Sequence, residues 1–229
     1  MAARHLTRRL ALQAFVCSVL ALMFTALPAL FAAQESEADI ERQNRVADLL
    51  RFLDARPGAR IADVGAGDGF YTVRIARVVA PNGQAVAVDI SESALDKLRE
   101  RVAHEDASQN HLNIAVVLGA LDDPHLAAGQ YDAALIHNAY HEMTEHEAML
   151  AHIRAALKPG GRLVVVEPMH LSSVGLTRQE QVAQHDIAAD IVEDELRAAG
   201  LDVVERDDKF VTFTAVPGGF WLILARRPE

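Results

Sequence analysis

The sequence predicts an α/β domain, built on a largely parallel sheet with helices on both faces and preceded by an apolar N-terminal leader. Two observations favour this fold class. Between residues 40 and 226, short apolar runs of the kind found in buried parallel strands alternate with stretches of helical spacing. A glycine-rich turn also joins the first apolar run to the helix that follows it, which is where open α/β sheets bind ligands.

That turn lies between a predicted strand at 60–64 and a predicted helix at 71–79, and reads Gly65-Ala66-Gly67-Asp68-Gly69. Glycine allows a positive φ and a close approach of ligand to backbone, while the helix N-terminus offers free N–H groups. A dinucleotide turn would need its third glycine at position 70, which is Phe70. The turn therefore predicts a site for a polar ligand of another kind.

Acidic residues accompany the turn on two strands. Asp63 belongs to the strand that precedes it, and Asp89 ends the next predicted strand at 85–88. A carboxylate at the second position can accept hydrogen bonds from both hydroxyls of a ribose.

This combination, Asp63-x-Gly65-x-Gly67-x-Gly69 with Asp89, resembles the class I S-adenosylmethionine-dependent methyltransferases, and in particular secreted or exported predicted bacterial methyltransferases. A second motif that resembles this family is the run 157–161, Leu-Lys-Pro-Gly-Gly, which an apolar strand follows. The resemblance covers about residues 40 to 226. It implies a Rossmann-like seven-stranded sheet closed by an antiparallel hairpin, S-adenosylmethionine as cofactor, and methyl transfer to a small molecule.

The resemblance also implies the cofactor-binding residues. The glycines would shape the turn around the cofactor, Asp63 would hold the loop and the amino group, and Asp89 would bind the ribose. Related enzymes often bind the adenine with an Asp at the position of Ala120, so here Asp122 or backbone groups would take that role. The full set is Asp63, Gly65, Ala66, Gly67, Gly69, Asp89, Ile90, Ala120, Leu121, Asp122, His137 and Asn138.

The acceptor side is expected next to the strand at 131–136. Methyl transfer from a sulfonium needs positioning and a dry site, and a base only where the acceptor loses a proton. His141 is expected to orient the acceptor or take its proton, with Glu142 and His185 as further catalytic candidates. No metal is expected. His137 and His146 lie near His141, but His137 ends a strand and no acidic residue has a matching spacing.

The helices are expected as follows. A one-sided apolar stripe predicts a helix within 34–56, and Ser91 would cap a helix that ends near His104. Thr144 and Glu147 have the spacing of a capping box for the next helix. After a loop at 170–175, a helical stretch containing His185 would continue to Ala199.

Composition narrows the function classes. A formal charge of −10 and a pI near 5.4 argue against nucleic-acid binding, which leaves small molecules as the expected substrates. The single cysteine, Cys17, excludes a disulfide framework and a cysteine-based metal site. Nothing in the sequence indicates an oligomeric state.

Residues 1–33 are predicted to be a signal peptide or a membrane anchor, and 34–229 the methyltransferase domain. Three arginines precede an uncharged run from Leu10 to Ala33, but a small-x-small cleavage site is poorly formed. The domain is therefore expected to be periplasmic, or anchored in the membrane and held outside the cytoplasm. Two alternatives remain at this point: an exported, non-catalytic binding domain with the same fold, and a nucleotide-dependent oxidoreductase.

Overall fold

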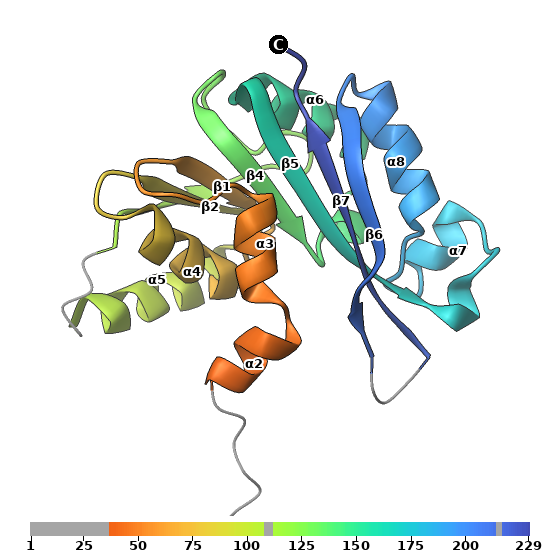
Figure 1. Ribbon diagram of the computed structural model, residues 1–229, viewed down its shortest axis with the longest axis horizontal. Coiled ribbons are helices and arrows are strands. Elements are labelled where there is room, and N and C mark those ends of the chain that lie inside the picture. Colours follow the sequence, from red (N-terminus) through yellow and green to blue (C-terminus); the bar gives the residue numbers. More distant parts are fainter. Residues whose placement is uncertain (1–36, 108–111, 214–216) are drawn as a thin grey trace, which may run out of the picture. The chain divides into compact units, whose positions relative to one another are not determined.

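The computed structural model describes residues 37–107, 112–213 and 217–229 (Figure 1). The chain divides into two compact units, residues 1–42 and 43–229, and the predicted leader at 1–33 lies outside the described residues. None of the helices in the described ranges combines the length and the apolar character needed to cross a bilayer.

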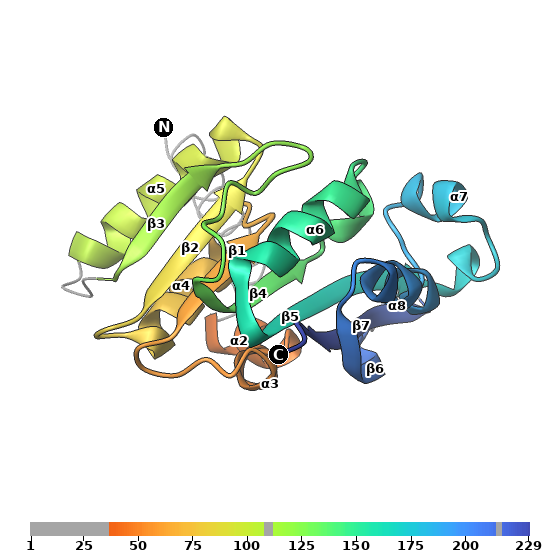
Figure 2. The same cartoon turned by 90° about the horizontal axis from the view of Figure 1, so that it is seen from above.

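Residues 43–229 contain a seven-stranded sheet in the order β3-β2-β1-β4-β5-β7-β6, which Figure 2 shows from β3 at one edge to β6 at the other. Strands β1 to β5 run parallel, while β7 is antiparallel to both β5 and β6. The predicted seven strands and the closing hairpin are confirmed. The strands are β1 Arg60–Val64, β2 Gln84–Asp89, β3 Ile114–Leu118, β4 Tyr131–His137, β5 Leu157–His170, β6 Asp202–Thr212 and β7 Gly218–Arg226.

Helices lie between successive parallel strands except between β3 and β4. The α-helices are α2 Glu37–Gln43, α3 Val46–Phe52, α4 Phe70–Val79, α5 Glu92–Ala107, α6 His146–Ala156, α7 Arg178–Val182 and α8 Ala189–Ala198. Two short 3-10 helices, η1 Tyr140–Glu142 and η2 Leu171–Ser173, follow β4 and β5.

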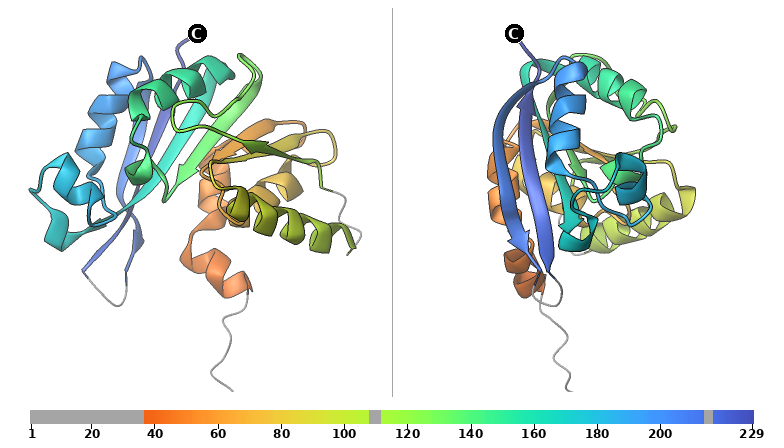
Figure 3. Two further views of the ribbon diagram at one scale, coloured as in Figure 1. Left: turned by 180° about the vertical axis from the view of Figure 1, so that it is seen from behind. Right: turned by 90° about the vertical axis from the view of Figure 1, so that its right-hand side faces the viewer.

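The sheet separates two apolar layers because successive side chains of a strand point to opposite faces. Ile61 of β1 packs in a cluster that includes Leu49 of α3 and Ile75 of α4. Its neighbour Ala62 belongs to the other cluster, which contains Ile153 of α6 and side chains of α8. Figure 3 shows α3 on one side of the sheet and α6 and α8 on the other. The predicted cover of helices on both faces is confirmed.

The sheet order sets where a ligand can bind. β1 lies between β2 and β4, so the chain leaves β1 toward one neighbour and returns later on the other side. In open α/β sheets the crevice at the carboxyl ends of such strands is the usual ligand site. The turn at 65–69 follows β1, and the segment after residue 137 follows β4, at this crevice.

Two predicted helices are interrupted by residues with left-handed backbone. Arg45, at φ 49°, separates α2 from α3, and His185, at φ 56°, lies in the turn between α7 and α8. A right-handed helix cannot continue through such a residue. The predicted capping box at Thr144 is also wrong, because the N-cap of α6 is Glu145 and makes no side-chain cap bond.

Candidate functional site

A pocket opens at the carboxyl ends of β1, β2 and β4. Its volume is about 230 Å³, somewhat below the range of about 300–1,000 Å³ that is usual for small-molecule sites. Its walls come from the ends of β1 and β2, from the segments that follow β3 and β4, and from η1 and α6. The lining residues are Val64, Gly65, Gly67, Val88, Asp89, Ile90, Ala120, Leu121, Asn138, Ala139, Glu142, Met143 and Met149.

The three glycines of the turn all have positive φ, but each position requires glycine for a different reason. A Cβ on Gly65 would lie 2.4 Å from the Cβ of Ala139, and one on Gly69 would lie 2.8 Å from Leu98 Cγ. These two glycines allow the turn to pack against its neighbours. A Cβ on Gly67 would meet no atom within 4 Å, and Gly67 lines the pocket. Its missing side chain therefore leaves room for a ligand.

Asp89 joins this turn to the end of β2. Its Oδ2 accepts a hydrogen bond from the backbone N–H of Gly67 at 2.9 Å, and its Oδ1 accepts one from Ser91 at 2.8 Å. Each carboxylate oxygen has a second lone pair. Because Asp89 lines the pocket, both of its carboxylate oxygens can still accept hydrogen bonds from hydroxyl groups of a ligand.

Asp63 has a different position from the one the resemblance suggests. Its carboxyl group is buried beneath the turn, where it accepts a hydrogen bond from the hydroxyl of Thr72 on α4 at 2.6 Å. Burial raises the pKa of Asp63 to about 6, and the charge of Asp89 contributes in the same direction. Asp63 thus holds β1 to α4 and does not line the pocket.

The predicted cofactor-binding residues fall into two groups. Those that line the pocket are Gly65, Gly67, Asp89, Ile90, Ala120, Leu121 and Asn138, and those that do not are Asp63, Ala66, Gly69, Asp122 and His137. Asp122 is exposed, and its backbone carbonyl is bonded to His152. Sequence reasoning missed Met143 and Met149. Met149 has the spacing of a buried helical stripe, so no local signal marks it as a pocket residue.

The side chain of His137 points away from the pocket, because successive side chains of β4 point to opposite faces of the sheet and His137 follows Ile136. Its Nε2 is 2.8 Å from the hydroxyl of Tyr71, and its ring stacks on Phe220 with centroids 5.4 Å apart. Burial lowers the pKa of His137 to about 4. The ring is therefore neutral near pH 7, and the phenol of Tyr71 can donate to it.

Glu167, on β5, organises the segment that follows β4. Its side chain is fully buried, and Oε1 accepts hydrogen bonds from the backbone N–H groups of Ala139 and Tyr140, each at 2.7 Å. Oε2 lies 2.6 Å from Nδ1 of His141. Sequence reasoning missed Glu167, although a lone acidic residue at the end of an apolar strand run was a usable signal. A buried carboxylate is costly unless it is paired in this way.

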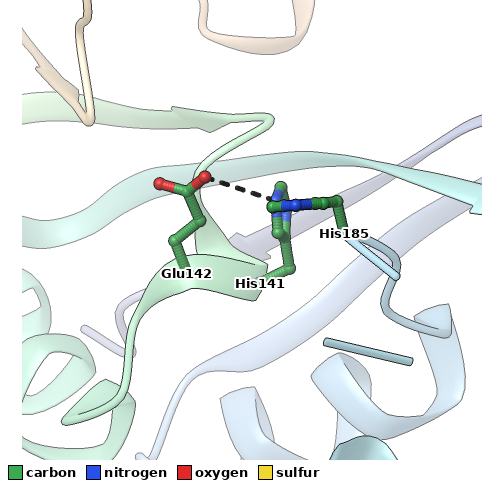
Figure 4. Close-up of side chains that lie close together, drawn as sticks. All are labelled: His141, Glu142 and His185. Atoms are coloured by element: carbon green, nitrogen blue, oxygen red, sulfur yellow. Dashed lines mark ion pairs between the residues drawn. The ribbon is translucent and has the colours of Figure 1, made fainter. Parts of the chain in front are cut away.

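The predicted catalytic residues His141, Glu142 and His185 lie together (Figure 4). His141 is only 3% exposed, and its Nε2 lies 3.8 Å from Oε1 of Glu142. The rings of His141 and His185 meet edge to face, with centroids 5.6 Å apart. Burial lowers the pKa of His141, but the hydrogen bond and charge of Glu167 outweigh this effect, so the net shift is upward.

The turn after α7 presents His185 to this cluster. The turn is closed by hydrogen bonds from the N–H of His185 to the carbonyl of Val182 and from the N–H of Asp186 to Gln181. The buried carboxylate of Asp186 accepts from the hydroxyl of Ser173 and lies 2.8 Å from Nδ1 of His170. These bonds fix the loop on which His185 lies.

Comparison with known proteins finds similar methyltransferase domains. Residues 61–161 match the family described as "Methyltransferase domain". The demethylmenaquinone methyltransferase of Symbiobacterium thermophilum is 37% identical over 112 residues, which are 49% of this chain and 43% of that protein. The chain spans 33% to 46% of the length of the curated relatives it matches.

Solved structures show the same fold. An S-adenosylmethionine-dependent methyltransferase from Aquifex aeolicus superposes with a TM-score of 0.66 at 18% identity, over 82% of this chain and 93% of that one. Phosphoethanolamine N-methyltransferase 2 from Haemonchus contortus, solved in complex with S-adenosylmethionine, gives 0.64 at 17% identity, over 82% and 53%. The predicted resemblance to class I methyltransferases and the predicted fold are confirmed.

The neutral state of His137 predicts how stability depends on pH. In the unfolded chain the pKa of His137 is near 6.5, so the unfolded state binds a proton as the pH falls below that value. In the folded state the ring takes up the proton only near pH 4. This contribution to stability is present above pH 6.5 and is lost as the pH falls toward 4. We expect it to account for about 1 to 2 kcal/mol of the stability lost between pH 7 and pH 5.

Urea unfolding of the parent and of His137→Phe at both pH values measures this contribution. The variant keeps an aromatic ring against Phe220 but has no titrating group, so it should lose less stability than the parent between the two pH values. Equal losses in the two proteins would contradict the assignment.

Glu167 predicts a second effect on stability. Glu167→Ala would leave the N–H groups of Ala139 and Tyr140 without their acceptor, and we expect it to cost about 3 kcal/mol or more in unfolding free energy. Glu167→Gln keeps one acceptor oxygen and should cost less. Glu147→Ala, an exposed substitution on α6, is the control and should change stability by no more than about 0.5 kcal/mol. A Glu167→Ala variant as stable as this control would refute the structural role.

Proposed function

We propose that this protein, which carries a class I methyltransferase domain, transfers a methyl group from S-adenosylmethionine to a small molecule. The observation that carries the proposal is the junction of Gly67 and Asp89. A backbone N–H of the glycine turn is bonded to the carboxylate that ends β2, and both residues line one pocket at the crevice between the strands. The bond keeps the turn and the carboxylate side by side, so a single ligand can contact both.

The apolar walls of the pocket support an adenosine ligand. Ile90 is 56% exposed and Leu121 is 54% exposed, although both are large apolar side chains. Both line the pocket, next to Asp89 and Ala120 respectively. A planar adenine between them would remove this surface from water, at about 25 cal/mol for each Å² buried. The ribose hydroxyls would then reach Asp89, and the sulfonium end would extend along the glycine turn.

The acceptor would enter from the side of the cluster formed by His141, Glu142 and His185. In the reaction a lone pair of the acceptor attacks the methyl carbon, the carbon–sulfur bond breaks, and its electron pair stays on sulfur as a neutral thioether. Any proton on the attacking atom leaves to a nearby base or to water. Glu142 lines the cofactor pocket and also faces His141, so it connects the two halves of the site.

The two alternative functions differ from this proposal in what they bind. A nucleotide-dependent oxidoreductase would need a turn that fits a dinucleotide, whereas the third glycine here is Gly69 rather than residue 70. A non-catalytic binding domain would need no polar cluster beside the cofactor pocket. The acidic net charge of −10 favours a small-molecule acceptor over nucleic acid.

Replacing Gly67 tests the cofactor site. Gly67→Ala places a Cβ in the pocket, and we expect it to weaken S-adenosylmethionine binding at least tenfold by calorimetry. Gly129→Ala is the matched control, because Gly129 also has a positive φ, 65° against 54°, and an equally open Cβ position. Both variants should lose about 1 kcal/mol of stability, but the control should bind the cofactor like the parent. A parent that binds a reduced nicotinamide cofactor and no S-adenosylmethionine would support the oxidoreductase instead.

We further propose that residues 1–33 direct the domain out of the cytoplasm, as a signal peptide or as a membrane anchor. Support comes from the sequence alone: arginines at 4, 8 and 9 precede an uncharged run that continues to Ala33. Such a run is long enough to span a bilayer, and the arginines favour a cytoplasmic N-terminus.

A reporter that is active only outside the cytoplasm, fused after Glu229, should be active with the full chain. Removal of residues 1–33 should abolish the signal, and replacement of the arginines by glutamates should reduce it. Equal reporter activity with and without residues 1–33 would contradict export through this segment.

A further inference from the structure

We propose that His141, Glu142 and His185 bind a divalent transition-metal ion of the zinc type, and that the ion holds an oxygen or nitrogen atom of the methyl acceptor. The second clause rests on the proposed function, while the first does not. The sequence-based expectation of no metal considered His137 and His146 as partners of His141. The structure brings a different set together, two imidazoles and a carboxylate from two separate segments.

The ligand atoms converge on one point. One nitrogen from each histidine and one oxygen of Glu142 all lie within 4.8 Å of one another, and Figure 4 shows the three side chains pointing toward the same space. In a tetrahedral zinc site with bonds of about 2.1 Å, ligand atoms are about 3.4 Å apart. The exposed side chains of Glu142 and His185 can rotate to close this difference, because neither is packed in the core.

Hydrogen bonding leaves the correct nitrogen of His141 available. Nδ1 faces the carboxylate of Glu167 at 2.6 Å, and a carboxylate accepts but does not donate, so Nδ1 carries the proton of the neutral ring. Nε2 then presents its lone pair toward Glu142 and His185. A carboxylate behind a histidine in this way is the usual second layer of a metal site, where it orients the ring and makes it a better ligand.

The charges around the cluster favour a cation. Among the residues that the structure describes, the only ion-pair partner of Glu142 and of Glu167 is His141, and that of Asp186 is His170. No lysine or arginine of the described ranges forms an ion pair with these carboxylates. A divalent ion at the cluster would compensate negative charge that the protein itself leaves unbalanced.

The loop of His185 has a defined backbone. His185 adopts a left-handed conformation, φ 56°. The turn bonds of His185 and Asp186 hold this conformation.

The position of the cluster suggests what the ion does. Three protein ligands leave a coordination position free, as in catalytic zinc sites. Glu142 lines the cofactor pocket, so this free position lies beside the space proposed for the methyl donor. An acceptor that binds the ion through a hydroxyl or phenol oxygen would lose its proton more readily, because the ion stabilises the alkoxide or phenolate, whose oxygen keeps a lone pair for the methyl carbon.

Metal titration of the purified, untagged full-length protein tests the site. After treatment with a chelator, the parent should bind one Zn²⁺ per chain by calorimetry, and Co²⁺ should show the visible absorption of a four-coordinate site. His185→Ala and Glu142→Ala should each weaken binding at least tenfold. The controls, His104→Ala on α5 and Glu147→Ala on α6, remove an exposed imidazole and an exposed carboxylate elsewhere and should bind like the parent.

Glu167→Gln tests the positioning role of the buried carboxylate. It keeps all three ligands, yet we expect a 10- to 100-fold loss of Zn²⁺ affinity and an altered Co²⁺ spectrum, in a variant whose circular dichroism shows that it is folded. Absence of saturable binding to the parent, or parent-like binding by His185→Ala and Glu142→Ala, would overturn the metal site. S-adenosylmethionine titrations of the same samples separate the two proposals. Cofactor binding without Zn²⁺ binding would overturn only the metal site. Zn²⁺ binding without cofactor binding would support the metal site and contradict the proposed function.

Discussion

The hydrogen bonds of one buried carboxylate, Glu167, hold the segment that borders both the pocket and the histidine cluster. This side chain reaches from β5 across to the segment after β4 and accepts from two backbone N–H groups and from His141. The same segment supplies Ala139 and Glu142 to the wall of the pocket. Since a buried charge is stable only when its hydrogen bonds are satisfied, the segment has little freedom to move away from β5. The pocket wall and the orientation of the histidine therefore depend on one interaction.

The two faces of the sheet have separate roles near the crevice. On one face, His137 packs with Tyr71 and Phe220 and is kept neutral by burial. On the other, the pocket takes its walls from the ends of the strands and from Met149 of α6. The alternation of side chains along a strand explains this division, since residues 136 and 137 must point to opposite faces. Polar groups that are close in the sequence thus serve different parts of the domain.

The cofactor side and the acceptor side differ in how they are built. Backbone groups and short side chains dominate the cofactor side, where Gly67 and Asp89 are joined directly. The acceptor side consists of longer polar side chains that come from η1 and from the turn before α8. In the proposed function, the second set of side chains would select the acceptor.

The sequence by itself determined the fold class and the glycine turn with Asp89, because these features depend on short local runs of residues. Apolar periodicity and glycine spacing are local properties, and the strands predicted at 60–64, 85–88 and 131–136 agree with β1, β2 and β4 to within one residue at each end. Only the tertiary structure decided which side chains meet. It assigned Asp63 to Thr72 beneath the turn, turned His137 away from the pocket, joined Glu167 to His141, and brought His185 beside Glu142 from more than 40 residues away. Contacts of this kind depend on which face of a strand or turn a residue occupies and on how distant segments pack, and neither leaves a periodic signal in the sequence.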